Sequence, residues 1–240
     1  MCGHFTLKIS PYVLKEYFGL GLDPVLPPHW EYFPDSKATW KNWQDDFSGV
    51  LKRLDQSRHK ILVIDQHEDQ MIASNMIWGM IPPSVTDPEE FRSKYSTFNA
   101  KAETIEQNRM YAAPYKEKRC LVPASTFYEY SGPRGKRIPN PFSPKDEPIF
   151  SFAGLWETWT GPKGYPIETC TIITTEPNDL IKPIHHRMPV ILHHERYTDW
   201  LDTKNKNMKN LRKILIPYSS EQMVDVGIDV SKKREVEYKG

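Results

Sequence analysis

Residues 168–175 read Glu-Thr-Cys-Thr-Ile-Ile-Thr-Thr, a run in which six of the eight side chains branch at Cβ. Branched side chains lose rotamer freedom in a helix and pack well on the pleated surface of a sheet. We therefore expect a central strand here, and the elements on either side of it define the fold class.

Several shorter runs have the same β-type character. They are residues 60–65, with a hairpin partner at 71–80, and residues 120–123, 127–130, 149–154 and 190–192. The alternation Phe-Tyr-Glu-Tyr at 127–130 is typical of a strand. Residues 132–148 are crowded with Gly and Pro and predict a turn or a long hairpin connection.

Helical patterns surround these strands. They cover residues 11–19 and 195–215, and residues 87–95 and 102–112 are predicted to form helical turns. The first has Pro near its start and Gly at its end, the usual asymmetry of helix termini. No internal repeat or low-complexity tract is visible. We expect one α+β domain over residues 1–240, rich in strands in its middle and with helices around it.

Composition narrows the class of protein. A chain of 240 residues can bury a core without metal or disulfide staples. Its three cysteines contain no Cys-x-x-Cys pair, which argues against a disulfide framework or a zinc cluster. No apolar run reaches the roughly 18–20 residues that span a bilayer, and the first residues do not resemble a secretory signal. We expect a cytoplasmic protein.

The charge is almost balanced, at +1. A polyanionic partner would therefore have to be held by local patches. Residues 92–119 carry seven basic and three acidic side chains, and residues 204–213 carry five basic and none acidic. By themselves such runs are explained by solvated faces of a loop and a helix.

Cys2 is the first residue that indicates chemistry. Removal of Met1 would expose it as an N-terminal 1,2-aminothiol, with an amine of reference pKa about 7.7–8.0 and a thiol of about 8.5. The amine can form a Schiff base with an aldehyde, and the thiol can then close that base into a five-membered thiazolidine ring. Neither an internal cysteine nor an internal lysine can perform both steps. A cysteine at this position can also occur by chance.

Three polar residues lie in apolar or β-type surroundings, namely Asn99, Glu129 and His185. A carboxylate between Tyr128 and Tyr130 would have its pKa raised by desolvation, which suits a proton donor and acceptor at neutral pH. Each of the three also has an ordinary structural explanation. The adjacent histidines 185 and 186 do not predict a metal site, because neighbours on a strand point apart and no third ligand has suitable spacing.

Taken together, several segments resemble the SRAP family (SOS response-associated peptidases, or abasic-site-processing proteins). The matching segments are residues 1–3 (Met-Cys-Gly), 78–82 (Trp-Gly-Met-Ile-Pro), 99–104 (Asn-Ala-Lys-Ala-Glu-Thr), 119–124, 127–130, 152–156, 171–175 and 184–189 (Ile-His-His-Arg-Met-Pro). They follow the family's order and cover residues 1–6 and about 76–192. The resemblance implies a mixed, largely antiparallel, barrel-like β core flanked by helices.

The resemblance also implies a function. Proteins of this family bind single-stranded DNA at an abasic site and capture its aldehyde as a thiazolidine crosslink. They are also described as autopeptidases, as slow lyases and as able to reverse the crosslink. For this chain we therefore expect abasic single-stranded DNA as the partner, no cofactor, no metal, no membrane and a monomeric state.

Site residues follow by position in the motifs. Cys2 is the expected nucleophile, Asn99 orients it, Glu129 shuttles protons during sugar opening, and His185 assists Schiff-base chemistry and reversal. The expected DNA contacts are Lys101 and Arg187 at phosphates, Thr174 and Trp78 lining the site, and His4 at a further phosphate. In this light the basic excess in 92–119 also predicts a function.

The chain departs from the family pattern at several points. His4 stands where Arg is usual, which predicts a weaker or pH-dependent phosphate contact. Pro83 and Ser84 replace an aromatic wedge, so the expected base stacking has no counterpart there. Residues 24–60 lack the usual Arg-aromatic-Asn-x-Ala-Pro segment, and residues after 215 match poorly.

Two other classes of protein stay open. Glutamine-dependent amidotransferases also use a cysteine exposed after Met1. They resemble one another in Asn-Gly and Gly-Asp turns, and this chain contains neither dipeptide. The second alternative is a single-strand-binding module without catalysis, which the departures at residues 24–60 and 83–84 support.

Overall fold

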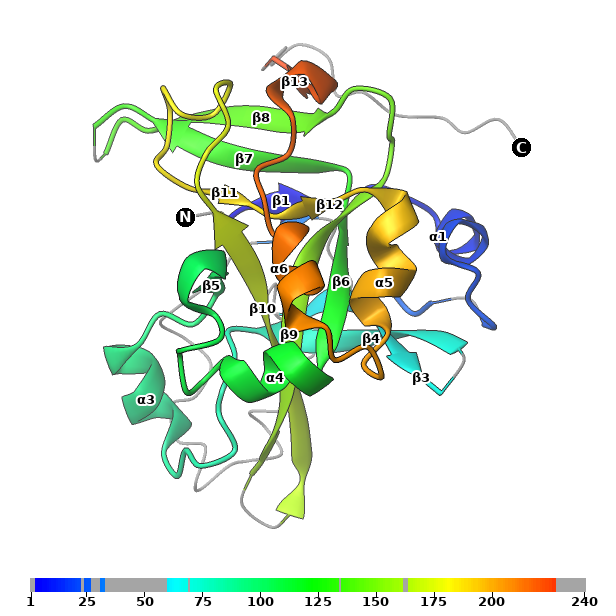
Figure 1. The fold of residues 1–240 in the computed structure, drawn as a ribbon. Coiled ribbons are helices and arrows are strands. Elements are labelled where there is room, and N and C mark those ends of the chain that lie inside the picture. Colours follow the sequence, from blue (N-terminus) through cyan, green and yellow to red (C-terminus); the bar gives the residue numbers. More distant parts are fainter. Residues whose placement is uncertain are drawn as a thin grey trace.

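Five strands close into a mixed barrel at the centre of the computed structural model (Figure 1). The model describes residues 3–22, 24–26, 31–32, 60–68, 70–133, 135–161 and 164–227. The barrel strands are β3 (Lys60–His67), β4 (Gln70–Trp78), β6 (Arg119–Ala124), β9 (Phe150–Thr160) and β10 (Pro166–Thr175). Strand β10 closes the ring because it pairs with β9 on one edge and, in parallel, with β4 on the other.

The barrel is filled by side chains. Strands β6, β9 and β10 are buried along most of their length on both faces, which explains their nearly continuous apolar sequences. Gly154 marks the tightest contact. A Cβ atom there would lie 2.9 Å from Cys120 Sγ and 3.2 Å from the Thr171 carbonyl oxygen. Only glycine allows β9 to approach β6 and β10 this closely.

A second sheet lies across one end of the barrel (Figure 1). Its order is β13 (Met223–Asp225), β8 (Ile138–Pro144), β7 (Thr126–Ser131), β1 (Phe5–Thr6) and β2 (Glu31–Tyr32). Aromatic rings join the two layers. Phe5 packs edge-on against Trp78 at 5.3 Å and against Phe152 at 5.5 Å, and Phe127 packs against Phe152 at 6.0 Å.

Short helices and strands complete the structure. The helices are α1 (Pro11–Phe18), α3 (Pro88–Lys94), α4 (Ala112–Glu117), α5 (Tyr197–Leu201) and α6 (Met208–Lys213), with single 3-10 turns η1 (Ala102–Thr104), η3 (His194–Arg196) and η4 (Ser220–Gln222). The remaining strands are β5 (Asn99–Lys101), β11 (Met188–Pro189) and β12 (Ile191–Leu192). Among the described helices, none is long and apolar enough to cross a membrane.

The predicted α+β domain and barrel-like core are confirmed, and the expected strand at residues 168–175 is the closing strand β10. The connection expected at 132–148 contains strand β8, paired with β7 in a hairpin. The sequence did not predict this strand, because prolines are rare within strands. Pro139 and Pro141 are two residues apart and face the same edge, and Val226 N donates to the Pro141 carbonyl on the side away from β7.

The helical turns predicted at residues 102–112 are confirmed as η1 followed by further turns, and α4 begins at Ala112. The helix predicted at residues 195–215 was too long. Residues 195–215 are divided into η3, α5 and α6, because the chain turns out of the helix at Asp202, where ψ is 91°. Most of residues 24–60 and all residues after 227 lie outside the described part, so the expected divergence there is not described.

Arg119 ties the helices to the barrel. Its side chain is buried, and its guanidinium donates to the carbonyls of Tyr115 and Lys116 at the end of α4. It also donates to the carbonyls of Trp200 and Asp202 at the end of α5. A single cation therefore satisfies the last carbonyls of two helices, which would otherwise be buried without donors.

We expect Arg119→Met to lower the free energy of unfolding by about 3–5 kcal/mol, since several buried carbonyls lose their donors. Urea unfolding should show a lower midpoint with an unchanged slope. Arg119→Lys should be intermediate, because an ammonium cannot reach both helix ends. Arg109→Met, at an exposed position, is the control and should change stability by less than about 0.5 kcal/mol. An unchanged midpoint in Arg119→Met would contradict this role.

Candidate functional site

The start of the chain runs beside strand β7. Phe5 is opposite Phe127, and Tyr128 N donates to the His4 carbonyl at 2.9 Å. The His4 ring stacks on Tyr128 at 4.1 Å, and its Nδ1 shares a 2.6 Å hydrogen bond with the Tyr130 hydroxyl. Cys2 lies outside the described residues, and it is bonded to Gly3, the first described residue of the chain.

His4 does not provide the exposed phosphate contact that the sequence predicted. Only 5% of the residue is exposed, and its ring contacts both Tyr128 and Tyr130. Its tight packing instead fixes the chain immediately after Cys2 onto strand β7. Tyr128 and Tyr130, which hold the His4 ring, lie on the opposite face of β7 from Glu129, because successive side chains of a strand alternate between its two faces.

Glu129 is the most perturbed carboxyl of the site. It lies on the buried face of β7 together with Phe127, and only 2% of it is exposed. Burial raises the pKa of Glu129 to about 7. The predicted rise in pKa has the expected cause, burial, although the flanking tyrosines lie on the other face of the strand.

His185 comes within reach of Glu129 from a distant part of the chain. Its Nδ1 is 3.6 Å from Glu129 Oε2, which is a close electrostatic contact. The same nitrogen is 3.1 Å from Arg187 N and 3.0 Å from the Arg187 carbonyl oxygen. Burial lowers the pKa of His185 below its usual range. At pH 7 the Glu129 carboxyl is therefore present in both protonation states beside an imidazole that favours its neutral form, and such a pair can exchange a proton with a bound molecule.

Three further predicted residues lie around the C-terminal end of β10, one on this strand and two on the neighbouring β5. Thr174 is opposite Lys101 of β5 on one edge and opposite Pro189 of β11 on the other. Asn99 lies two residues before Lys101 and is opposite Ile172. The buried Thr174 hydroxyl donates to the Ala100 carbonyl at 3.3 Å, whereas Lys101 is exposed. Lys101 can therefore meet a phosphate, and Thr174 mainly holds β5 in place.

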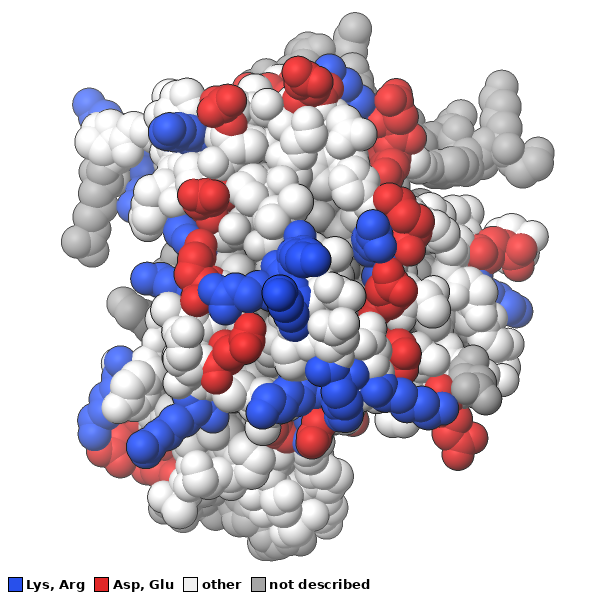
Figure 2. Space-filling view, viewed as in Figure 1, with Lys and Arg blue, Asp and Glu red and all other residues white. Residues whose placement is uncertain are grey.

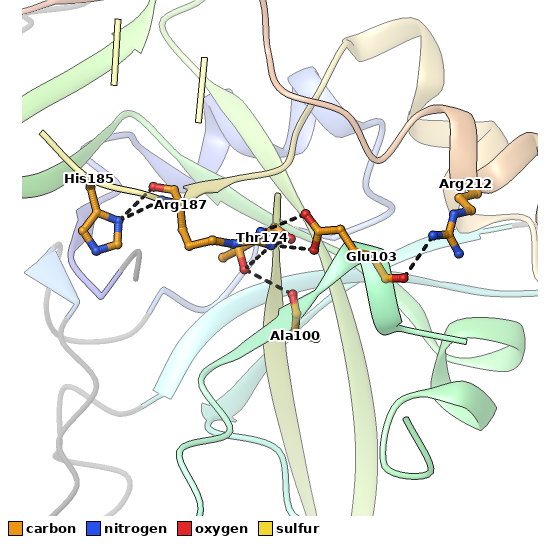
Figure 3. Close-up of polar contacts among 6 residues, drawn as sticks. All are labelled: Ala100, Glu103, Thr174, His185, Arg187 and Arg212. Atoms are coloured by element: carbon orange, nitrogen blue, oxygen red, sulfur yellow. Dashed lines mark hydrogen bonds and ion pairs between the residues drawn. The ribbon is translucent and has the colours of Figure 1, made fainter. Parts of the chain in front are cut away.

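Arg187 is already engaged by a carboxylate, as Figure 3 shows. Its two terminal nitrogens donate to the two Glu103 oxygens at 2.8 and 2.9 Å, and one of them also donates to the Thr174 carbonyl at 2.7 Å. The guanidinium side chain is only 13% exposed. The predicted phosphate contact of Arg187 would have to compete with this bidentate pair.

Trp78 supports the site from inside the core. The residue has no exposed surface, and its Nε1 donates to the Phe98 carbonyl at 2.9 Å. The prediction that it forms a wall against DNA is therefore corrected to a supporting position behind Asn99. Pro83 and Ser84 lie in an exposed turn that Val85 N closes onto the Pro82 carbonyl at 3.1 Å.

Basic side chains gather on one face. Figure 2 shows a band of Lys and Arg over the region of α4 and α6. Not every basic residue of segment 92–119 is free to contribute to this band, since Arg119 is buried and Lys118 pairs with Glu157. Arg212 of α6 donates to the Glu103 carbonyl at 3.0 Å and to Glu106 Oε1 at 3.3 Å. This contact connects the basic helix to the segment that holds Arg187.

Within the described ranges, no group of three or more His, Cys, Asp or Glu side chains has a geometry that could hold a metal ion. Cys120 and Cys170 are fully buried in the barrel, and burial raises the pKa of the Cys120 thiol well above its usual range. Neither thiol is therefore expected to ionise and react as a nucleophile.

Sequence reasoning identified the residues around the end of β10 but missed two of their partners. Glu103 and Arg212 hold Arg187 and its surroundings, yet they are 84 and 25 positions away from it in the sequence. Glu103 lies inside the motif at residues 99–104, so the sequence drew attention to this segment. Its ion pair with Arg187 could not be predicted, because ion pairs between distant segments leave no periodic pattern in one sequence.

Comparison with known proteins agrees with this architecture. The family model for the SOS response associated peptidase (SRAP) matches residues 1–233. Two Bacillus subtilis proteins, the abasic site processing proteins YoaM and YoqW, are 34% and 36% identical to this chain, each over 93% of it and over 88% and 90% of their own lengths. A crystal structure of a Bacteroides thetaiotaomicron protein is similar with a TM-score of 0.73 at 26% identity, covering 93% of this chain and 90% of that one. The chain belongs to the SOS response associated peptidase family.

Proposed function

We propose that this protein processes abasic sites in DNA, and that it captures the lesion covalently through Cys2. The names of its relatives support the first part, since YoaM and YoqW are called abasic site processing proteins. The second part rests on one observation above the others. A buried carboxyl with a pKa of about 7 lies on the strand that pairs with the first described residues after Cys2.

The atoms of the proposed reaction balance without any cofactor. In the ring-opened sugar of an abasic site, C1′ is an aldehyde. The Cys2 amine adds to this carbon, water leaves, and the resulting imine is attacked by the Cys2 thiolate. The nitrogen takes up a proton as the C–S bond forms. The aminothiol and the aldehyde are therefore converted into a thiazolidine and one water molecule, and no oxidant is needed.

Glu129 and His185 supply the proton transfers in this proposal. Opening the sugar ring requires a proton at the ring oxygen and a base at the C1′ hydroxyl. A carboxyl with a pKa of about 7 is present in both forms at neutral pH, so it can act in turn as acid and as base. His185, 3.6 Å away, can relay a proton to the imine nitrogen.

The strand itself is bound mainly through its backbone. An abasic site offers no base to read, so register must come from phosphates and neighbouring sugars. The exposed Lys101, two residues after Asn99, is a predicted phosphate contact that has no ion pair among the described residues. We infer that single-stranded DNA is preferred, because a lesion within a duplex would first have to be unstacked.

The first test concerns Cys2. Incubation with single-stranded DNA that contains one abasic site should give a covalent product that is stable without a reducing agent. Cys2→Ala retains the amine but not the thiol, so its product should appear only after borohydride trapping of the imine. Cys170→Ala, at a buried thiol, is the matched control and should retain the stable product. Intact mass should show a chain lacking Met1. A stable product from Cys2→Ala would refute the mechanism.

The second test concerns Glu129. Glu129→Gln should slow product formation by roughly 10²–10⁴-fold at pH 7 with unchanged DNA affinity. Protonated Glu129 donates to the ring oxygen, so the wild-type rate should fall as pH rises through about 7, the pKa that burial gives this carboxyl. The descending limb should be absent in Glu129→Gln, measured by single-turnover gel assays from pH 5 to 9. An equal rate in both proteins would remove Glu129 from the mechanism.

A further inference from the structure

The hairpin of strands β7 and β8 continues past Glu129 toward its tip at residues 132–137. Glu129 is opposite Asn140, and two residues further along β7 Ser131 is opposite Ile138. Opposite residues lie on the same face of a sheet, and residues two positions apart on a strand also share a face. Ile138 therefore lies on the face of Glu129, diagonally across the two strands and about 7–8 Å from it.

Ile138 presents an apolar side chain to solvent beside the proposed acid. Its exposed fraction is 58%, whereas Phe127 and Phe142, a pair on the same face of the hairpin, are fully buried. The face therefore changes from core to buried acid to open surface within two pairs of residues. Single exposed apolar residues are common on proteins, so the surroundings of Ile138 decide whether it has a role.

Asn140 fixes the position of Ile138 relative to Glu129. Its Nδ2 lies 3.2 Å from the Glu129 carbonyl oxygen and 3.0 Å from both Ser131 Oγ and the Ile138 carbonyl oxygen. The two N–H groups of this amide are thus shared among three acceptors on both strands. Because the amide links the main chain at Glu129 to the main chain at Ile138, the exposed side chain is held on a rigid element.

Two cations precede Ile138 at the tip of the hairpin. Lys136 and Arg137 are exposed, and neither forms an ion pair among the described residues. Burial is the main cause of the low pKa of His185, and the positive charge of Arg137 contributes to it, so Arg137 is near the site. The tip also lies on the side of the molecule where the chain begins (Figure 1). A phosphate next to a bound lesion would meet these two cations.

An abasic site leaves a gap in the stack of bases. The base on each side of the gap loses one stacking partner, so one of its apolar faces is exposed to water. Proteins cover such faces with apolar side chains, isoleucine among them, that enter between neighbouring bases. The phosphates on either side of the gap stay charged and attract Lys and Arg. A site for the neighbouring nucleotide therefore needs an apolar side chain with cations beside it.

We propose that the tip of the β7–β8 hairpin binds the nucleotide next to the abasic site. Ile138 packs on the exposed face of its base, in the place of the missing base, while Lys136 and Arg137 contact its phosphate. This assignment rests on the proposed function, since it requires the lesion to lie at Glu129. The contact is made to the face of the base, so it does not depend on which of the four bases is present.

The first test measures reversible binding of single-stranded DNA that contains tetrahydrofuran, an abasic analogue without an aldehyde. A second tetrahydrofuran in place of the neighbouring nucleotide, on either the 5′ or the 3′ side, should weaken binding by the wild type about three- to tenfold. Ile138→Ser should lose this dependence on the neighbouring base. Ile216→Ser, at an equally exposed isoleucine, is the control and should retain it. Equal dependence in Ile138→Ser and wild type, or none in wild type on either side, would overturn the proposal.

The second test concerns the phosphate. With the same DNA, Arg137→Gln should reduce the slope of log affinity against log salt by about 0.7, the value for one phosphate of a single strand. Lys145→Gln removes an exposed cation just beyond the other end of β8 and should leave the slope unchanged. A wild-type slope in the double variant Lys136→Gln/Arg137→Gln would overturn the phosphate contact at the tip.

Failure of this proposal can be distinguished from failure of the proposed function, because tetrahydrofuran cannot form a thiazolidine. If the wild type shows the dependence on the neighbouring base but gives no covalent product with a true abasic site, the chemistry of Cys2 is refuted and the hairpin site is supported. If the product forms and Ile138→Ser retains the wild-type dependence, only the hairpin site is refuted.

Discussion

Strand β10 is hydrogen-bonded on both edges, and the rest of the molecule depends on this. One edge pairs with β4 and β5 in parallel, and the other with β9 and β11 in antiparallel fashion. The pairing with β4 and β9 closes the barrel. The pairing with β5 and β11 continues past the ring, so that Asn99 and the segment after His185 are joined to the same rigid strand. A site built on such elements is held more precisely than one built on loops alone.

Burial of Glu129 has a cost that the fold has to meet elsewhere. Because its folded-state pKa is raised to about 7, the folded protein binds this proton more tightly than the unfolded chain does. The stability contributed by the protonated form is present at low pH and is lost as pH rises from the usual carboxyl range to about 7. At neutral pH the site therefore reduces stability. The aromatic contacts between the two layers and the capping by Arg119 supply stabilisation that needs no carboxylate.

The sequence allowed most strands to be predicted, for a definite physical reason. Barrel strands are buried on both faces, so their apolar and branched residues are continuous, as in residues 168–175. Strand β8 was missed because prolines are rare within strands, yet Pro139 and Pro141 face the edge away from β7, where they cost no bond in that ladder. The helix expected at 195–215 was too long, since basic residues continue past the break at Asp202 and apolar residues resume at Met208.

The site was predictable at the level of residue types but less so at the level of partners. The contact between Glu129 and His185 joins positions 56 residues apart, and no pattern in one sequence reports it. Trp78 and His4 were expected at DNA, but their burial makes them supports. Motif position identifies which residues matter, whereas the tertiary structure decides whether a side chain meets the ligand or holds another residue.

These assignments suggest how a protein of almost neutral charge can act on a polyanion. Reversible binding to DNA depends strongly on the number of phosphates neutralised, and it weakens steeply with salt. The chain has a net charge of +1, and among its described arginines Arg187 is paired to Glu103 and Arg119 is buried. In the proposed mechanism a covalent bond through Cys2 would hold the lesion after a weak encounter, so that a large number of phosphate contacts would not be needed to retain the DNA.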